Sequence, residues 1–182
     1  MSKPIVIALS GASGCGKTTL IKNLASYFQC PYLFFDDYID KDTYPNNMEA
    51  WFNQGANVSL IQTPRFTEAV VLAKNTENKG KYVFIEEPFG RQRNSLSHLI
   101  DYVILLDTPL DMCLERIINR KNNHFNVSNY IKMYESYFKN IYAHTVEYVR
   151  INCDYVFNNK ISSAKATVKI SKWLICNTVK LV

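Results

Sequence analysis

The stretch GASGCGKTT, residues 11–19, places three glycines, a lysine and two threonines within nine positions. It fits the pattern G-x-x-x-x-G-K-[ST], in which glycines let successive backbone N–H groups turn toward one point and form a nest for phosphate oxygens. Lys17 is suited to reach the β- and γ-phosphates, and the Thr18 hydroxyl is suited to complete a Mg²⁺ shell. This phosphate loop is therefore expected to bind ATP with Mg²⁺. The residues expected to make these contacts are Gly11, Ala12, Ser13, Gly14, Cys15, Gly16, Lys17, Thr18 and Thr19.

Carboxylates follow two other apolar stretches, in YLFFDDY and YVFIEEPFG. A hydroxyl that attacks a γ-phosphoryl group benefits from a carboxylate that accepts its proton. Asp36 is the first residue after its apolar stretch and is expected to do this, with Asp37 as a turn residue or a partner of metal-bound water. Glu86 is expected to contact Mg²⁺ water or a sugar hydroxyl, while Glu87 faces the other way. The alternative is that these acids are solvated ends of strands.

Two arginines four positions apart, Arg116 and Arg120 in LERIINRKNNHF, fall on one face of a predicted helix. Neither has an acid three or four residues away on that face, and a like-charged pair costs a few tenths of a kcal/mol in an isolated helix. An anion between them would reverse this cost. The pair is therefore expected to clamp phosphate on a lid of about residues 116–128. The alternative is two solvated basic side chains.

The segment between the second strand and the next long helix carries side chains that could contact an acceptor. Tyr38 and Trp51 offer aromatic faces on which a base or a pyridine ring could stack, and Arg65 lies shortly after them. We expect these three residues to lie near the acceptor, together with Asp36, Asp37 and Glu86. The histidines share no metal-binding spacing with one another or with a cysteine, and we expect them to be surface or packing residues.

The elements that must position these residues alternate along the chain. Short apolar runs rich in Val, Ile, Phe and Tyr predict buried strands, and segments with helical spacing separate them. Such alternation is typical of a parallel sheet covered on both faces, where ligands bind beyond the carboxyl ends of the strands. Every candidate residue falls at such an end. The strands are expected at 4–10, 32–35, 81–86, 102–107 and 155–157, and the helices at 18–28, 64–79, 109–120, 128–149 and 162–177.

Composition places limits on the class of protein. The chain has 182 residues, 47% of them hydrophobic and 20% charged, with a net charge of +5, which suits one globular domain over 1–182. The basic residues are spread along the chain, so we expect no nucleic acid as partner. Five cysteines without a CxxC pair favour reduced thiols and a cytoplasmic protein. No apolar run reaches membrane-spanning length, and no membrane partner is expected.

Over roughly residues 4 to 140 the chain resembles the uridine kinase and nicotinamide riboside kinase group. The resemblance is carried, in this order along the chain, by GASGCGKTTL, FFDDY, the FIEE strand end, and TPLDMCLERIINR followed by YIKMYESYF. The resemblance implies a single-domain P-loop fold with a five-stranded parallel sheet of order 2-3-1-4-5. It implies transfer of the ATP γ-phosphate to a small, nucleoside-like acceptor. It matches Asp36 to the catalytic carboxylate, Glu86 to the second acid, and Arg116 and Arg120 to the lid arginines.

The chain also departs from that group. Relatives commonly have glycine after the second acid, where this chain has Glu87 and Pro88, and many carry a D-x-P pattern that is missing near Trp51. The tail CDYVFNNKIS resembles the last strand of dephospho-coenzyme A kinases. Two alternatives therefore stay open, a kinase of another metabolite such as a coenzyme precursor, and a nucleotide-binding regulatory protein without turnover. The oligomeric state stays open as well.

Overall fold

Five parallel strands form one sheet in the order β2-β3-β1-β4-β5. The computed structural model describes residues 3–76, 80–120, 126–158 and 160–178. The central strands are buried throughout because helices cover both faces of the sheet. This arrangement confirms the fold class and the strand order expected above. The strands are β1 (Ile5–Ser10), β2 (Tyr32–Leu33), β3 (Tyr82–Glu86), β4 (Tyr102–Asp107) and β5 (Tyr155–Asn158).

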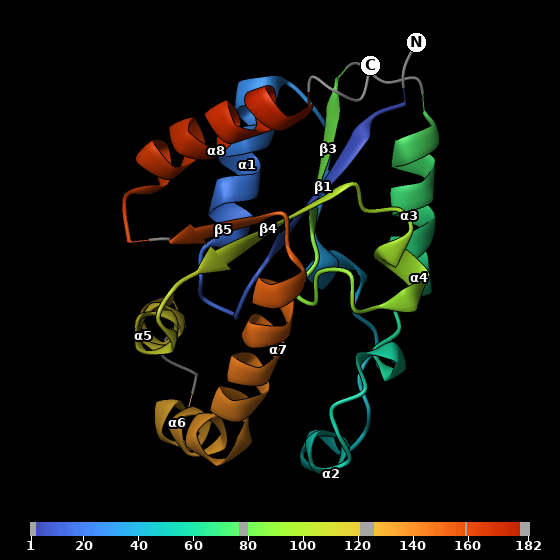
Figure 1. The fold of residues 1–182 in the computed structure, drawn as a ribbon. Helices are drawn as coiled ribbons and strands as arrows, with labels where there is room; N and C mark the ends of the chain where they lie inside the picture. The colour runs from blue at the N-terminus through green and yellow to red at the C-terminus, as the bar shows by residue number, and fades with distance from the viewer. Residues whose placement is uncertain (1–2, 77–79, 121–125, 159, 179–182) are drawn as a thin grey trace.

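Two apolar layers lie on opposite faces of the sheet, because successive side chains of a strand point to opposite sides. Ile5, Ile7 and Leu9 of β1 pack with α1 (Lys17–Phe28) and α8 (Ser163–Thr178). The intervening side chains of β1 pack with α3 (Pro64–Asn75), α4 (Asn94–Ser97) and α7 (Lys139–Asn152). Figure 1 shows α1 and α8 side by side, with α3 and α4 on the other side of the sheet.

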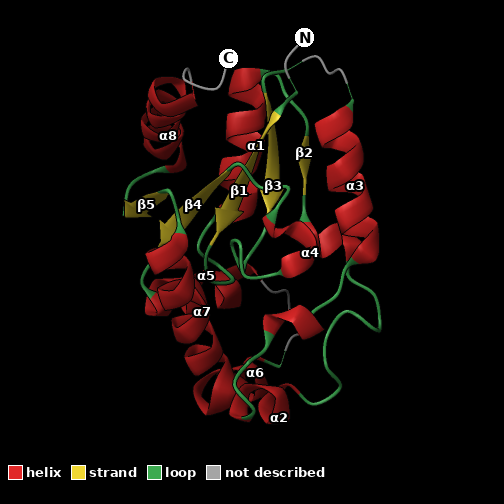
Figure 2. Cartoon of the chain, turned by 45° about the vertical axis from the view of Figure 1, so that its right-hand side comes forward, coloured by secondary structure: helices red, strands yellow, loops and turns green. Residues whose placement is uncertain are grey.

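The remaining helices gather beyond the carboxyl ends of the strands, in the lower half of Figures 1 and 2. They are α2 (Met48–Asn53), α5 (Leu110–Arg120) and α6 (Val127–Met133), together with a 3₁₀-helix at Phe35–Tyr38 and another at Val58–Leu60. A π-helical turn, Tyr134–Phe138, joins α6 to α7. Ligand-binding groups in parallel sheets are expected at this end. None of the described helices combines the length and the apolar character that crossing a membrane requires.

Three elements differ from the sequence-based expectation by more than one residue. The second strand was expected to reach Phe35 but ends at Leu33, because a 3₁₀-helix containing Asp36 and Asp37 begins at Phe35, and aspartates favour such local turns. The single helix expected over 128–149 is divided by the π-helical turn and continues to Asn152. The expected helix over 64–79 ends at Asn75, and residues 77–79 lie outside the described part of the chain.

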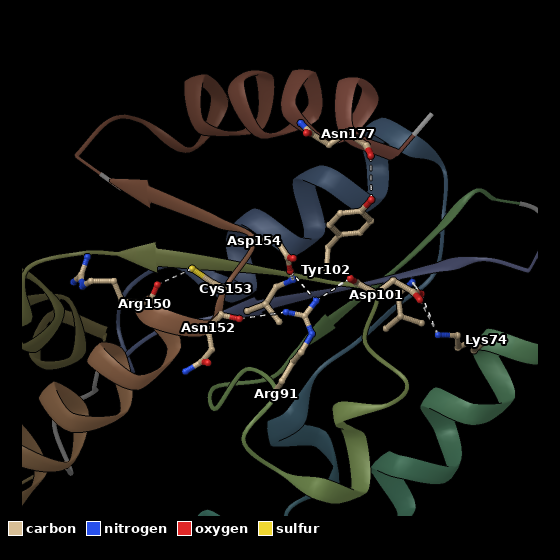
Figure 3. Close-up of polar contacts among 11 residues, drawn as sticks. Lys74, Arg91, Asp101, Tyr102, Arg150, Asn152, Cys153, Asp154 and Asn177 are labelled. Atoms are coloured by element: carbon tan, nitrogen blue, oxygen red, sulfur yellow. Dashed lines mark hydrogen bonds and ion pairs between the residues drawn. The ribbon is translucent and has the colours of Figure 1, made fainter. Parts of the chain in front are cut away.

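A polar network fastens the amino ends of three strands, opposite to the candidate site. The Asp101 carboxylate accepts a hydrogen bond from the Val6 N–H at 2.8 Å. The Asp154 carboxylate accepts one from the Val103 N–H at 2.7 Å and pairs with Arg91 at the same distance. Arg91 also donates to the Asp101 carbonyl oxygen at 2.8 Å, as Figure 3 shows. The network therefore ties the loop after β3 to the starts of β4 and β5.

Candidate active site

The phosphate loop connects β1 to α1 by a path that requires glycine. Gly14 has a φ of +84°, and a Cβ placed there would lie 2.4 Å from the Cys113 carbonyl oxygen of α5. Gly16, at the N-cap of α1, also has left-handed backbone angles and places no side chain over the first turn. The N–H groups at the start of α1 are thus left without a side-chain cap, which is the arrangement that binds phosphate at a helix N-terminus.

Lys17 folds back over the loop. Its Nζ donates hydrogen bonds to the carbonyl oxygens of Gly11 at 3.0 Å and Ala12 at 3.1 Å, and lies 3.5 Å from Glu86 Oε1. The side chain is only 6% exposed. Burial works against its charged form, but the neighbouring Cys15 and the Glu86 carboxylate outweigh burial and raise the pKa of Lys17. The lysine therefore places a positive charge where a phosphate would be held.

Glu86 ends β3 next to the phosphate loop, since it is paired in register with Leu9 of β1. Burial raises the pKa of its carboxyl group, while Lys17 and a hydrogen bond with Thr18 act in the opposite direction. Mg²⁺ in phosphate sites prefers one or two carboxylates together with hydroxyl and phosphate oxygens. Thr18 and Glu86 supply this donor set, so the residues present fit the expected metal. No cluster of three or more His, Cys, Asp or Glu side chains suited to a metal occurs among the described residues.

A cavity of about 400 Å³ opens on one side of the phosphate loop, and we call it the acceptor cavity. Two carboxylates, Asp36 and Glu86, face it, and Lys17 is the one cation among the described residues that line it. The rest of the lining is mainly apolar and aromatic, as is usual for small-molecule sites. The other lining residues are Gly11, Ala12, Ser13, Phe35, Tyr44, Met48, Trp51, Ile61, Pro88, Phe89, Phe138, Ile141, Tyr142 and Thr145.

The residues expected near the acceptor are placed differently from one another. Trp51 lines the acceptor cavity and donates its indole N–H to the Asn57 carbonyl oxygen at 2.9 Å. Asp37 and Arg65 are exposed and are not among the lining residues. Tyr38 packs against Phe66, with ring centroids 5.2 Å apart, and is likewise not a lining residue. The acceptor roles of these residues stay predictions.

Several aromatic lining residues were not singled out from the sequence. Phe138 and Tyr142 follow helical spacing within the helix expected over 128–149, and in the structure they pack against the core and also line the acceptor cavity. Tyr44 lies in the loop after the 3₁₀-helix, where burial and the nearby Asp36 raise its pKa to about 12. Phe35 and Phe89 flank the acid pairs. The signal that could have identified two of them is that Phe35 directly precedes Asp36, and that Phe89 follows Glu87 with one proline between them.

Glu87 forms a buried ion pair with Arg93, so the alternative of a solvated strand end is wrong here. The side chains are 0% and 1% exposed, and Arg93 Nε donates to Glu87 Oε1 at 3.1 Å. Arg93 Nη1 also donates to the Ile61 carbonyl oxygen at 3.2 Å and to Thr63 Oγ1 at 2.8 Å. Its guanidinium group lies 5.0 Å from the centre of the Phe35 ring. Arg93 thereby joins the loop after β3 to the segment before α3, and both line the acceptor cavity.

A second cavity of about 370 Å³ borders another part of the phosphate loop, at Gly14, and we call it the donor cavity. Both predicted lid arginines line it. Arg116 Nη1 lies 3.4 Å from the carbonyl oxygens of Gly14 and Cys15, and Arg120 Nε donates to the Arg116 carbonyl oxygen at 3.2 Å. Residues 121–125 of the expected lid lie outside the described part of the chain. The other lining residues are Gly16, Thr19, Leu20, Asn119, Ile161, Ser163 and Ala166.

Comparison with known proteins supports the fold. The family model for the KAP family P-loop domain matches residues 1–182. No curated protein matches the chain in sequence. Solved structures share the fold at low identity. A deoxyadenosine kinase from M. mycoides has a TM-score of 0.63 at 14% identity, with 94% of this chain and 100% of that chain covered.

Two further structures are kinases of other small molecules. A sugar kinase from Janibacter has a TM-score of 0.60 at 16% identity, with 94% of each chain covered. A shikimate kinase from Acinetobacter baumannii, solved in complex with shikimate, has a TM-score of 0.50 at 18% identity, with 97% of this chain and 96% of that chain covered. At these identities the likeness extends to the fold alone.

Proposed function

The chain belongs to the KAP family of P-loop domains, and we propose that it is a Mg²⁺- and ATP-dependent kinase that phosphorylates a hydroxyl group of a small, nucleoside-like acceptor. One observation carries the proposal, namely that the phosphate loop borders two cavities that share no lining residue, and that the carboxylates among the described lining residues belong to one of them. A kinase needs a donor site and an acceptor site that meet at the phosphate. A protein that only binds nucleotide needs no second cavity with a carboxylate at its inner end.

Each residue has a proposed task. Lys17 would exchange its bonds to the Gly11 and Ala12 carbonyl oxygens for contacts with phosphate oxygens, because its charge is retained in the buried site. Thr18 and Glu86 would hold Mg²⁺, which neutralises phosphate charge when bound. Asp36 lines the acceptor cavity and would take the proton of the acceptor hydroxyl. Arg116 and Arg120 would contact phosphate from the donor cavity, as parts of a lid of about 116–128 within a single domain.

The aromatic lining favours a flat acceptor. Phe35, Tyr44, Trp51 and Phe138 surround a volume that suits a ring with an attached sugar, and aromatic faces bind such rings well. A kinase of a coenzyme precursor would use the same donor side and remains the second candidate, motivated by the acceptor cavity's size. The proposal includes reduced thiols and a cytoplasmic location, in keeping with five cysteines that form no CxxC pair.

A screen of acceptors tests the proposal. Purified protein is incubated with MgATP and single nucleosides, nicotinamide riboside, or coenzyme precursors, and ADP formation and phosphorylated product are measured. We expect ADP formation that depends on one of the nucleoside-like acceptors. The Lys17→Ala variant should lose it. ADP formation that is equal without any acceptor would indicate a hydrolase, and absence of ADP formation throughout the panel would contradict the kinase assignment.

A further inference from the structure

Aromatic side chains of α6, of the π-helical turn after it and of α7 form a stack that reaches the acceptor cavity. The Phe138 and Tyr142 rings are stacked, with centroids 6.0 Å apart and planes 13° apart. Tyr130 of α6 stacks on Phe138 at 6.2 Å. The π-helical turn Tyr134–Phe138 lies within this segment, and such turns occur frequently at functional sites. The stack therefore holds the Tyr142 ring firmly at the cavity wall.

The Tyr142 hydroxyl lies where the acceptor cavity meets the phosphate loop. It is hydrogen-bonded to the side chain of Ser13 in the loop and to the Tyr130 hydroxyl. Tyr142 lines the same cavity as Ser13, Lys17 and Asp36. The hydroxyl thus reaches the loop from α7, a helix that the phosphate-binding pattern does not include.

The chemistry of this hydroxyl suits a phosphate oxygen. Burial raises the pKa of the Tyr142 phenol above its ordinary value, so the group stays a neutral O–H donor near neutral pH. Lys17 is the single cation among the described residues that line the acceptor cavity, whereas Arg116 and Arg120 line the donor cavity. A neutral donor on the acceptor side would add a hydrogen bond there without adding negative charge.

We propose that the Tyr142 hydroxyl donates a hydrogen bond to the γ-phosphoryl group of the bound nucleoside triphosphate, from the side that faces the acceptor. This assignment rests on the proposed function, because it requires the triphosphate in the phosphate loop. Ser13 holds the hydroxyl in position before the nucleotide binds. The stack with Phe138 then keeps the ring in place while the hydroxyl changes its partner.

Calorimetric titration of two nucleotides tests the assignment without knowledge of the acceptor. MgADP and the Mg²⁺ complex of the non-hydrolysable analogue AMP-PNP are titrated into wild type, Tyr142→Phe and Tyr148→Phe. The first variant keeps the ring and its stacking and loses the hydroxyl alone. Tyr148 lies on the same helix with 38% of its surface exposed and is not a lining residue of the acceptor cavity, so its variant is the matched control.

The two nucleotides should respond differently. Tyr142→Phe should bind MgAMP-PNP about tenfold more weakly than wild type, because a hydrogen bond to a charged group is lost, and should bind MgADP within about twofold of wild type. Tyr148→Phe should match wild type for both. Equal weakening for both nucleotides, or none for either, would overturn the role of Tyr142 and leave the kinase proposal intact. A wild-type protein that binds neither nucleotide would overturn both, and an acceptor screen without product would overturn the kinase proposal alone.

Discussion

Replacing Arg93 with alanine should destabilise the protein strongly, because it leaves the Glu87 carboxylate buried without its counter-charge. The two side chains are 1% and 0% exposed. Besides Arg93, the Phe89 N–H donates a hydrogen bond to this carboxylate, at 3.3 Å. Removing one partner of a buried ion pair costs about 3–5 kcal/mol. For a chain of this size that loss lowers the melting temperature by about 6–20 °C.

Urea unfolding followed by circular dichroism measures this loss, with Lys139→Ala as control. Lys139 pairs with Glu135 at 3.6 Å on the surface, with both side chains about half exposed, so the control should change stability by no more than about 0.5 kcal/mol. The double variant Glu87→Leu with Arg93→Met removes both charges and should lose less than Arg93→Ala. A loss below about 1 kcal/mol for Arg93→Ala would refute the view that this pair holds the cavity wall together.

Three further predictions concern other parts of the fold. Gly14→Ala should destabilise the protein and weaken MgADP binding far more than Gly55→Ala. Both glycines have positive φ, but of the two only Gly14 would place a Cβ within 4 Å of other backbone atoms. Equal midpoints of unfolding and equal affinities of the two variants would contradict this. Hydrogen bonds from Arg150 hold the pKa of Asp107 below its usual value, so the stabilisation is present above the unfolded pKa of about 3.9 and is lost as pH falls. Unfolding of wild type and Arg150→Ala should therefore differ at pH 7 and converge below about pH 4, and a constant difference would argue against this cause. Arg120→Ala should lower kcat at least about tenfold with a smaller change in KM. An unchanged kcat would indicate that Arg120 is a solvated side chain without a role in phosphoryl transfer.

The fold could be predicted from the sequence because the patterns that indicate its strands and helices are local. Strands read as short apolar runs, and strict alternation with helices leaves few topologies other than a parallel sheet. The π-helical turn that divides the helix expected over 128–149 could not be predicted from the sequence. Aromatic residues at 134, 138 and 142 fit helical spacing whether or not such a turn is present. Local spacing also did not show that Phe138 and Tyr142 line a cavity in addition to packing against the core.

The phosphate-binding residues could also be predicted, because they lie in one contiguous stretch of sequence, residues 11–19. The acceptor side depends on contacts between distant segments. The pairing of Glu87 with Arg93 depends on a loop that turns back after Pro88, and Arg93 then reaches Ile61 and Thr63. Sequence spacing identifies the charges of such a pair but not their partners, so Glu87 was expected to be solvated or to face away.

Turnover of Asp36→Asn beside Asp37→Asn tests the central claim most directly, once the screen has given an acceptor. The claim is that a hydroxyl in the acceptor cavity is phosphorylated with Asp36 as proton acceptor, since both aspartates are exposed but Asp36 lines that cavity and Asp37 does not. Asp36→Asn should bind MgATP as wild type does and lose turnover by about 10² or more, while Asp37→Asn should retain most of it. The account is contradicted if Asp36→Asn turns over at the wild-type rate, or if Asp37→Asn is the inactive variant.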